Sequence, residues 1–196
     1  MLRYIVLVLL SAMVTSLGRA NDVTNLPIVG DFVTMITWGQ DSREGLKAGL
    51  ISFQDEAEKQ PNGMAHRRVL VYLGTSGTNS IYGIFLPKDD LIYYKLTLKT
   101  KDGQSVKQTD IGKHVGKLLP YEIPLEEAGE SGVGFSLRPP SVRQVGVLDL
   151  ETYFVLNDHE EYTVTVVVQV YLRIDGSKAR SLNLPPVSVS IPVGKQ

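Results

Sequence analysis

The stretch that decides the fold is Tyr162-Thr-Val-Thr-Val-Val-Val-Gln-Val-Tyr-Leu-Arg-Ile174. Every even-numbered position in it is apolar, whereas the odd-numbered positions are polar except at Val167 and Tyr171. Successive side chains of a β-strand point to opposite faces, so this period of two predicts one long strand with its even face in a core. The two apolar residues on the other face predict either a cover from the segment 108–140 or an exposed contact patch, and the cover is the preferred interpretation.

Strand signals also dominate the rest of the chain. Apolar segments with partial alternation, separated by turns rich in Gly, Pro and Asp, lie at 34–38, 46–53, 67–73, 81–86, 91–99, 145–154 and 187–193. The Asp102-Gly103 step predicts a hairpin, because Gly tolerates the positive φ of a tight turn. Pro192 donates no ladder hydrogen bond, so the last strand is expected at a sheet edge. Helix signals are confined to single turns at 55–60 and 125–128.

These segments predict an all-β fold, an antiparallel two-sheet sandwich. A parallel fold would need crossover helices, which the sequence does not contain. The charge balance does not indicate a nucleic-acid partner. The chain holds 20 Lys and Arg against 21 Asp and Glu, a formal net charge of −1, with no basic stripe and no acidic tail.

Residues 1–20 have the order of a secretion signal: Arg3, then an apolar run at 4–14, then a small-residue end at 18–20. The run is shorter than the roughly 20 apolar residues that span a bilayer, so we expect it to be cleaved and to leave no membrane anchor. The remaining residues, 21–196, are expected to form one domain, large enough to bury a core without disulfides. The chain has no cysteine and no Asn-x-Ser/Thr acceptor, which favours a bacterial periplasm or exterior.

The segment 156–162, Leu-Asn-Asp-His-Glu-Glu-Tyr, introduces the long strand with Asp158 four residues before Tyr162. It resembles the tyrosine corner of immunoglobulin-like and fibronectin-III-like sandwiches, although Glu160 stands where those proteins usually have a small residue. The resemblance implies an immunoglobulin-like sandwich in which Asp158 and Tyr162 are structural corner residues and the tyrosine hydroxyl bonds back to the backbone. It implies no chemistry, because such sandwiches carry many functions.

The stretch 38–46, which begins with Trp-Gly and ends with Gly-Leu, is similar to the opening of some secreted bacterial β-sandwich proteins of unknown role. A sandwich of the immunoglobulin class takes about 100 residues, and this chain is longer. The excess predicts either long loop insertions, chiefly at 74–90 and 108–140, or extra strands that enlarge the sheets.

Residues that carry chemistry are sparse. The absence of cysteine excludes a thiol nucleophile. His66, His114 and His159 stand 48 and 45 residues apart, without the short-spaced pair that zinc sites usually contain, so we expect no metal and no cofactor. Adjacent carboxylates such as Glu160-Glu161 point to opposite faces of an extended chain and are poor partners for acid–base catalysis.

The leading hypothesis is therefore an exported, non-catalytic binding or structural module that acts through loops or a sheet face on another exported protein or a glycan. Its candidate contact residues are Trp38, Val167 and Tyr171. The alternative is a periplasmic or secreted hydrolase or inhibitor with a non-contiguous site. Convergence of at least two carboxylates with one of the three histidines in a single cleft would favour that alternative.

Overall fold

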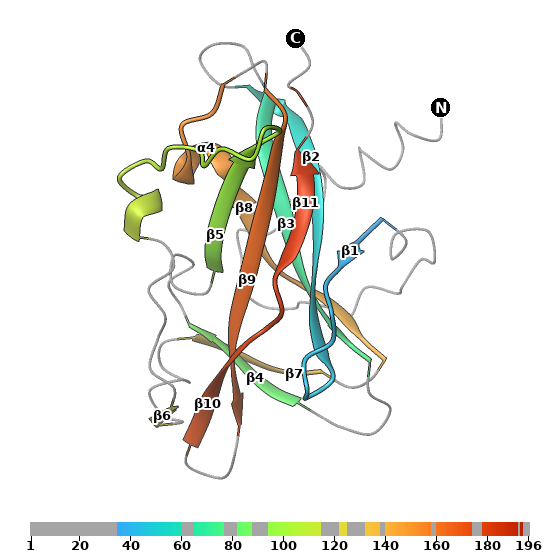
Figure 1. Cartoon of the computed structure of the whole chain (residues 1–196). Helices are drawn as coiled ribbons and strands as arrows, with labels where there is room; N and C mark the ends of the chain where they lie inside the picture. The colour runs from blue at the N-terminus through green and yellow to red at the C-terminus, as the bar shows by residue number, and fades with distance from the viewer. Residues whose placement is uncertain are drawn as a thin grey trace.

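The computed structural model describes residues 35–59, 65–76, 82–87, 94–114, 122–124, 132–137, 140–157, 160–173, 178–191 and 193. The expected signal at 1–20 and Asp158 of the corner lie outside the described residues. Figure 1 shows an open sandwich of two antiparallel sheets, which confirms the predicted all-β, two-sheet fold. Within the described residues, no helix is both long and apolar enough to cross a membrane.

The strands are β1 (Thr37–Trp38), β2 (Leu46–Lys59), β3 (Ala65–Thr75), β4 (Tyr82–Pro87), β5 (Tyr94–Thr100), β6 (Glu122–Pro124), β7 (Gly132–Leu137), β8 (Val142–Asp149), β9 (Tyr162–Arg173), β10 (Lys178–Asn183) and β11 (Val187–Ile191). A short helix, α4 (Leu150–Tyr153), follows β8, and a 3-10 turn, η1 (Gly112–His114), follows β5. Sheet 1 has the strand order β1-β2-β3-β8, and sheet 2 contains the other seven strands.

Sheet 2 is built around β9, which is paired along both of its edges. On one edge, β5 pairs with residues 162–168 and β4 with residues 171–172. On the other edge, β11 pairs with residues 162–166 and β10 with residues 169–173. β7 and β6 widen the second half of the sheet by pairing with β4 and β10. Two paired edges satisfy the backbone groups of β9 over most of its length, which makes it the central strand of the molecule.

The junction between β10 and β11 contains a bulge. Asn183 pairs with Gln169, and Val187 pairs with Val166. Between these two pairs the chain advances by four residues on this edge but by only three on β9. The residues at 185–186 are both proline, which has no N–H to donate to a ladder. One long strand is therefore divided into two that follow the same edge of β9 in succession.

The core lies between the sheets and is filled by the even face of β9. Val164, Val166, Val168 and Val170 are fully buried there among inward side chains of β2, β3 and β5. This confirms which face of the strand lies inside. The second half of β9 is buried on its other face as well, where Tyr171 is only 1% exposed.

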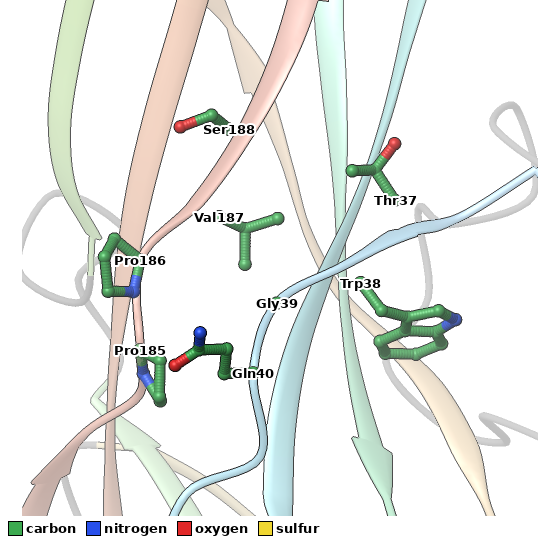
Figure 2. A pocket seen from close by; sticks show the side chains of 8 residues that line it. All are labelled: Thr37, Trp38, Gly39, Gln40, Pro185, Pro186, Val187 and Ser188. Carbon is green, nitrogen blue, oxygen red and sulfur yellow. The ribbon is translucent and has the colours of Figure 1, made fainter.

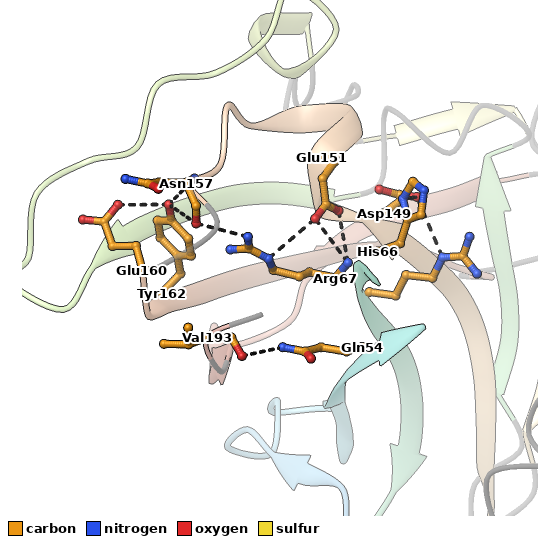
Figure 3. Close-up of polar contacts among 10 residues, drawn as sticks. Gln54, His66, Arg67, Asp149, Glu151, Asn157, Glu160, Tyr162 and Val193 are labelled. Atoms are coloured by element: carbon orange, nitrogen blue, oxygen red, sulfur yellow. Dashed lines mark hydrogen bonds and ion pairs between the residues drawn. The ribbon is translucent and has the colours of Figure 1, made fainter. Parts of the chain in front are cut away.

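β11 lies at a sheet edge, as predicted, since β9 is its one partner among the described strands. Its outer side is nevertheless occupied. Ser52 Oγ of β2 donates to the Ser190 carbonyl at 2.8 Å, and Gln54 Nε2 donates to the Val193 carbonyl at 2.9 Å (Figure 3). Side chains of sheet 1 thus satisfy carbonyls that an edge strand otherwise offers to another chain.

The predicted turn at Asp102-Gly103 is confirmed. Gly103 has a φ of 81° and donates its N–H to the Thr100 carbonyl at 2.9 Å. Val106 then donates to the Leu98 carbonyl at 3.0 Å, which returns the chain alongside β5. The positive φ explains why glycine stands at this position.

Two local predictions are wrong. The described part of the segment 55–60 is strand rather than a helical turn, because β2 continues through it after a register shift against β3. The segment 145–154 is not a single strand, since β8 ends at Asp149 and α4 follows. Leu150 and Tyr153 of that helix are both buried, and a spacing of three residues brings their side chains to one helical face.

Extra strands account for part of the length beyond a typical sandwich. β4 lies within 74–90, and β6 and β7 lie within 108–140. All three belong to sheet 2 and widen it around the second half of β9. In these parts of the chain, extra strands that enlarge sheet 2 therefore explain the excess length.

Val166→Ala is expected to lower the free energy of unfolding by about 1–3 kcal/mol, because it removes two methyl groups from a fully buried site. Urea denaturation followed by circular dichroism measures this loss. Val155→Ala is the matched control, since Val155 is 55% exposed, and its effect should stay within about 0.5 kcal/mol. Equal losses in the two variants would contradict the assigned core face.

Candidate functional site

Sheet 1 carries a second, smaller apolar cluster on the face that points away from the core. Along β3, Val71 points into the core, whereas Leu70 and Tyr72 belong to the cluster on the opposite face. The register places Leu70 between Ile51 of β2 and Val147 of β8. The solvent face of an antiparallel sheet is usually polar, so this set of apolar side chains is unusual.

We call this surface the outer-face patch; it consists of Ile36, Trp38, Ile51, Phe53, Leu70, Tyr72, Val142 and Val147. Leu70 and Tyr72 are buried at its centre, and burial raises the pKa of the Tyr72 hydroxyl well above its ordinary value. Most of the other members are half-buried, and Val147 is 39% exposed. The patch therefore presents apolar surface to solvent.

Trp38 is the only tryptophan of the chain and lies across two glycines of sheet 1. A β-carbon at Gly49 or Gly74 would come within 2.6 or 2.8 Å of its ring atoms, so the indole occupies space that side chains there would need. Lys47 Nζ lies 5.2 Å from the ring centroid, at cation–π distance. Glycine at these two positions thus allows the ring to cover the strand backbone.

A groove of about 420 Å³ lies between β1 and the start of β11 (Figure 2). Its lining residues are Thr37, Trp38, Gly39, Gln40, Pro185, Pro186, Val187 and Ser188. Figure 2 shows the indole of Trp38 pointing away from Val187. Prolines, polar side chains and Val187 make up most of the lining, and Trp38 is the one residue that the groove shares with the outer-face patch.

The three residues predicted to make contacts lie on two different faces. Trp38 belongs to the outer-face patch of sheet 1, whereas Val167 and Tyr171 lie on the face of sheet 2 that is turned away from the core. Val167 is half-buried, and the almost complete burial of Tyr171 leaves little surface for a partner. The face is therefore covered at Tyr171, whereas a cover formed by the segment 108–140 stays a prediction. Contact roles for these residues stay predictions, and the fold does not bring Trp38 together with the other two.

Tyr162, at the start of β9, has the hydroxyl-to-backbone bond that the resemblance implies (Figure 3). Its oxygen accepts the Asn157 N–H at 2.6 Å, and its proton is donated to Glu160 Oε2 at 3.0 Å. The Arg67 guanidinium lies 5.5 Å from the ring centroid and donates from Nη2 to the Asn157 carbonyl at 3.1 Å. Burial is the main cause that raises the pKa of the Tyr162 hydroxyl.

Beside this corner lies a charged cluster, which we call the His66 cluster: Asp55, His66, Arg67, Arg68, Asp149 and Glu151. Figure 3 shows His66, Arg67, Asp149 and Glu151 of this cluster. His66 Nδ1 lies 3.0 Å from Asp149 Oδ2, and Arg68 forms ion pairs with both Asp55 and Asp149. Glu151 accepts the backbone N–H of Arg67 at 3.2 and 3.3 Å. The cluster thus ties the adjoining ends of β2, β3, β8 and α4 together.

The two carboxyl groups at the β8–α4 junction influence each other. Burial is the largest cause that raises the pKa of Glu151, and a hydrogen bond with Asp149 acts in the same direction. Bonds from backbone N–H groups, including that of Arg67, lower the pKa and offset part of the rise. Asp149 and Glu151 therefore form a close pair in which Glu151 holds a proton more readily than an isolated glutamate does.

No protein-family model and no curated protein sequence matches this chain. Sequence reasoning found neither the outer-face patch nor the His66 cluster. A signal for the patch exists in Val69-Leu-Val-Tyr-Leu73, which is apolar on both strand faces, as in strands that are covered on two sides. The cluster has no local signal, because strand register brings His66 to acids that stand far away in the sequence.

Tyr162→Phe is expected to lower the free energy of unfolding by roughly 1–2 kcal/mol, because the Asn157 N–H loses its acceptor in a partly buried hydrogen bond. A shift of the urea midpoint measures the loss. Glu160→Ala removes only the second, side-chain contact of the hydroxyl and should cost less. An unchanged midpoint for Tyr162→Phe would contradict a structural role for the corner.

Proposed function

We propose that this protein is an exported, non-catalytic binding module with an immunoglobulin-like sandwich, and that it contacts another exported protein through the outer-face patch. The observation that carries the proposal is the apolar cluster on the outer side of sheet 1, which contains half-buried Trp38 and is extended by exposed Val147, the pairing partner of Leu70. Apolar surface of this kind on a sheet that already has a buried inner face is typical of a contact surface.

The chemistry of the patch favours a protein over a glycan. Aliphatic Ile51, Val142 and Val147 surround the aromatic residues, whereas a sugar needs hydrogen-bonding groups around its hydroxyls. Met35, which is 63% exposed, stands next to Ile36 of the patch in sequence. Aromatic residues and methionine are enriched at protein interfaces, and charged residues are depleted at their centres.

Export and the immunoglobulin-like class have their own support. The signal-like order of residues 1–20 supports export to a periplasm or exterior. The bond between the Tyr162 hydroxyl and the Asn157 backbone supports the resemblance to immunoglobulin-like sandwiches. Rigid sandwiches of that class commonly serve as scaffolds that present a face or loops to a partner.

A secreted hydrolase or inhibitor is the second candidate, and one observation favours it. His66 meets the two carboxyl groups of Asp149 and Glu151, which is the kind of convergence that such an enzyme requires. However, the residues of the His66 cluster do not line the groove between β1 and β11. Arg67 and Arg68 also lie beside these carboxyl groups. The binding module is therefore the better-supported proposal.

Val147→Lys is expected to abolish capture of the partner, because a charge would be placed on the rim of the apolar patch. The experiment compares proteins captured from the exported fraction of the native cell by wild type, Val147→Lys and Val155→Lys. Val155 is also exposed but is not a member of the patch, so its variant should capture the partner as wild type does. Equal thermal unfolding of the three proteins excludes a folding defect.

A second readout uses Trp38, whose fluorescence reports on the patch because no other tryptophan is present. Addition of the captured partner should reduce quenching of Trp38 by acrylamide in wild type and in Val155→Lys, but not in Val147→Lys. Binding that survives Val147→Lys, or a surface glycan that protects Trp38 equally well, would overturn the proposed contact. Hydrolysis by the purified protein that is lost in Glu151→Gln would instead support the second candidate.

A further inference from the structure

The His66 cluster brings three metal-ligating side chains together from separate elements. His66 lies near the start of β3, Asp149 at the end of β8 and Glu151 in α4. Arg68 is paired with Asp149 in the β3–β8 ladder, so His66 lies two residues further along the same face, next to the end of β8. One donor atom from each of the three side chains lies within 4.8 Å of the others, so small rotations of the side chains are enough to bring the three atoms onto one ion.

Among the three candidate ligand side chains, two polar atoms lack a hydrogen-bond partner in the part of the chain that the structure describes. They are His66 Nδ1 and Asp149 Oδ1, and both are buried from solvent. His66 Nδ1 lies 3.0 Å from Asp149 Oδ2, but the two atoms are not aligned as a hydrogen bond. Buried polar atoms are rarely left unsatisfied in folded proteins, and a bound ion is one of the usual reasons for an apparent exception.

We propose that His66, Asp149 and Glu151 bind a divalent cation of the zinc type. One imidazole nitrogen and two carboxylate oxygens form a donor set that suits Zn²⁺, with a fourth position left for water. Calcium is disfavoured, because it takes six to eight oxygen ligands. This inference goes beyond the proposed contact through the outer-face patch and does not depend on it.

The neighbouring charges leave room for such an ion. The cluster contains three carboxyl groups and two arginines, so its acidic side chains outnumber its basic ones by one apart from His66. Arg67 Nε and Arg68 Nε lie 3.7 and 3.8 Å from the carboxylates of Glu151 and Asp149, which is longer than a hydrogen bond. The arginines orient these carboxylates, and their charge makes the expected affinity weaker than in an all-acidic site.

The experiment titrates Zn²⁺ into the purified, metal-stripped chain in a calorimeter. One ion per chain is expected, with a rise in melting temperature because the ion binds only the folded state. His66→Gln is expected to weaken binding by at least about tenfold. His114→Gln is the matched control, since His114 lies exposed on η1, and it should bind as wild type does.

Glu151→Gln provides a second test that preserves an acceptor for the Arg67 N–H, and it too should weaken binding. Circular dichroism of each variant without zinc shows whether it is folded before its affinity is compared. The inference is overturned if wild type binds no zinc, or if His66→Gln and Glu151→Gln bind it as tightly as wild type. The same titration with Ca²⁺ should give no comparable binding, and preferred binding of calcium would also overturn the assignment.

Discussion

The double-sided pairing of β9 is the constraint on which the rest of this structure depends. Two strands that are consecutive in the described chain, β4 and β5, follow one edge, and β10 and β11 follow the other. Because both edges are occupied, the even valines are fixed toward sheet 1, and a slip of one residue would turn all of them outward. The Tyr162 hydroxyl holds the start of this strand to the Asn157 backbone. The long central strand thereby fixes the register of its four direct neighbours.

The outer face of sheet 1 changes from apolar to charged along its strands. The outer side of sheet 1 is apolar around Leu70 and Tyr72 and becomes charged toward His66 and Asp149, where the same strands end. We propose the apolar part as a contact surface for a partner protein, and the charged part brings together the three side chains proposed to bind a cation. The register of β2, β3 and β8 places both parts on this face, with a shift between Val71 and Tyr72 in the β3–β8 ladder, and α4 adds Glu151.

The sequence was sufficient to predict features that depend on local pattern. The alternation from Tyr162 onward predicts β9 and its inner face, and Gly103 predicts the hairpin with its positive φ. The helix at Leu150–Tyr153 was missed because four residues carry almost no helical period, and tertiary burial decides their conformation. The contact of Arg67 with Glu151 joins residues 84 positions apart. Such a site depends on which strands become neighbours, and no local signal contains that information.

Hydrogen–deuterium exchange of the purified protein, resolved to single amides, tests the central role of β9 most directly. Exchange of a deeply paired amide requires opening of the whole structure, whereas edge strands exchange through local openings. If β9 is the central strand, amides of Val164–Val170 should exchange slowest among the described residues and at the rate set by global unfolding. Amides of β1, which is two residues long and lies at the edge of sheet 1, should exchange much faster. Exchange of β9 as fast as that of β1 would contradict the account.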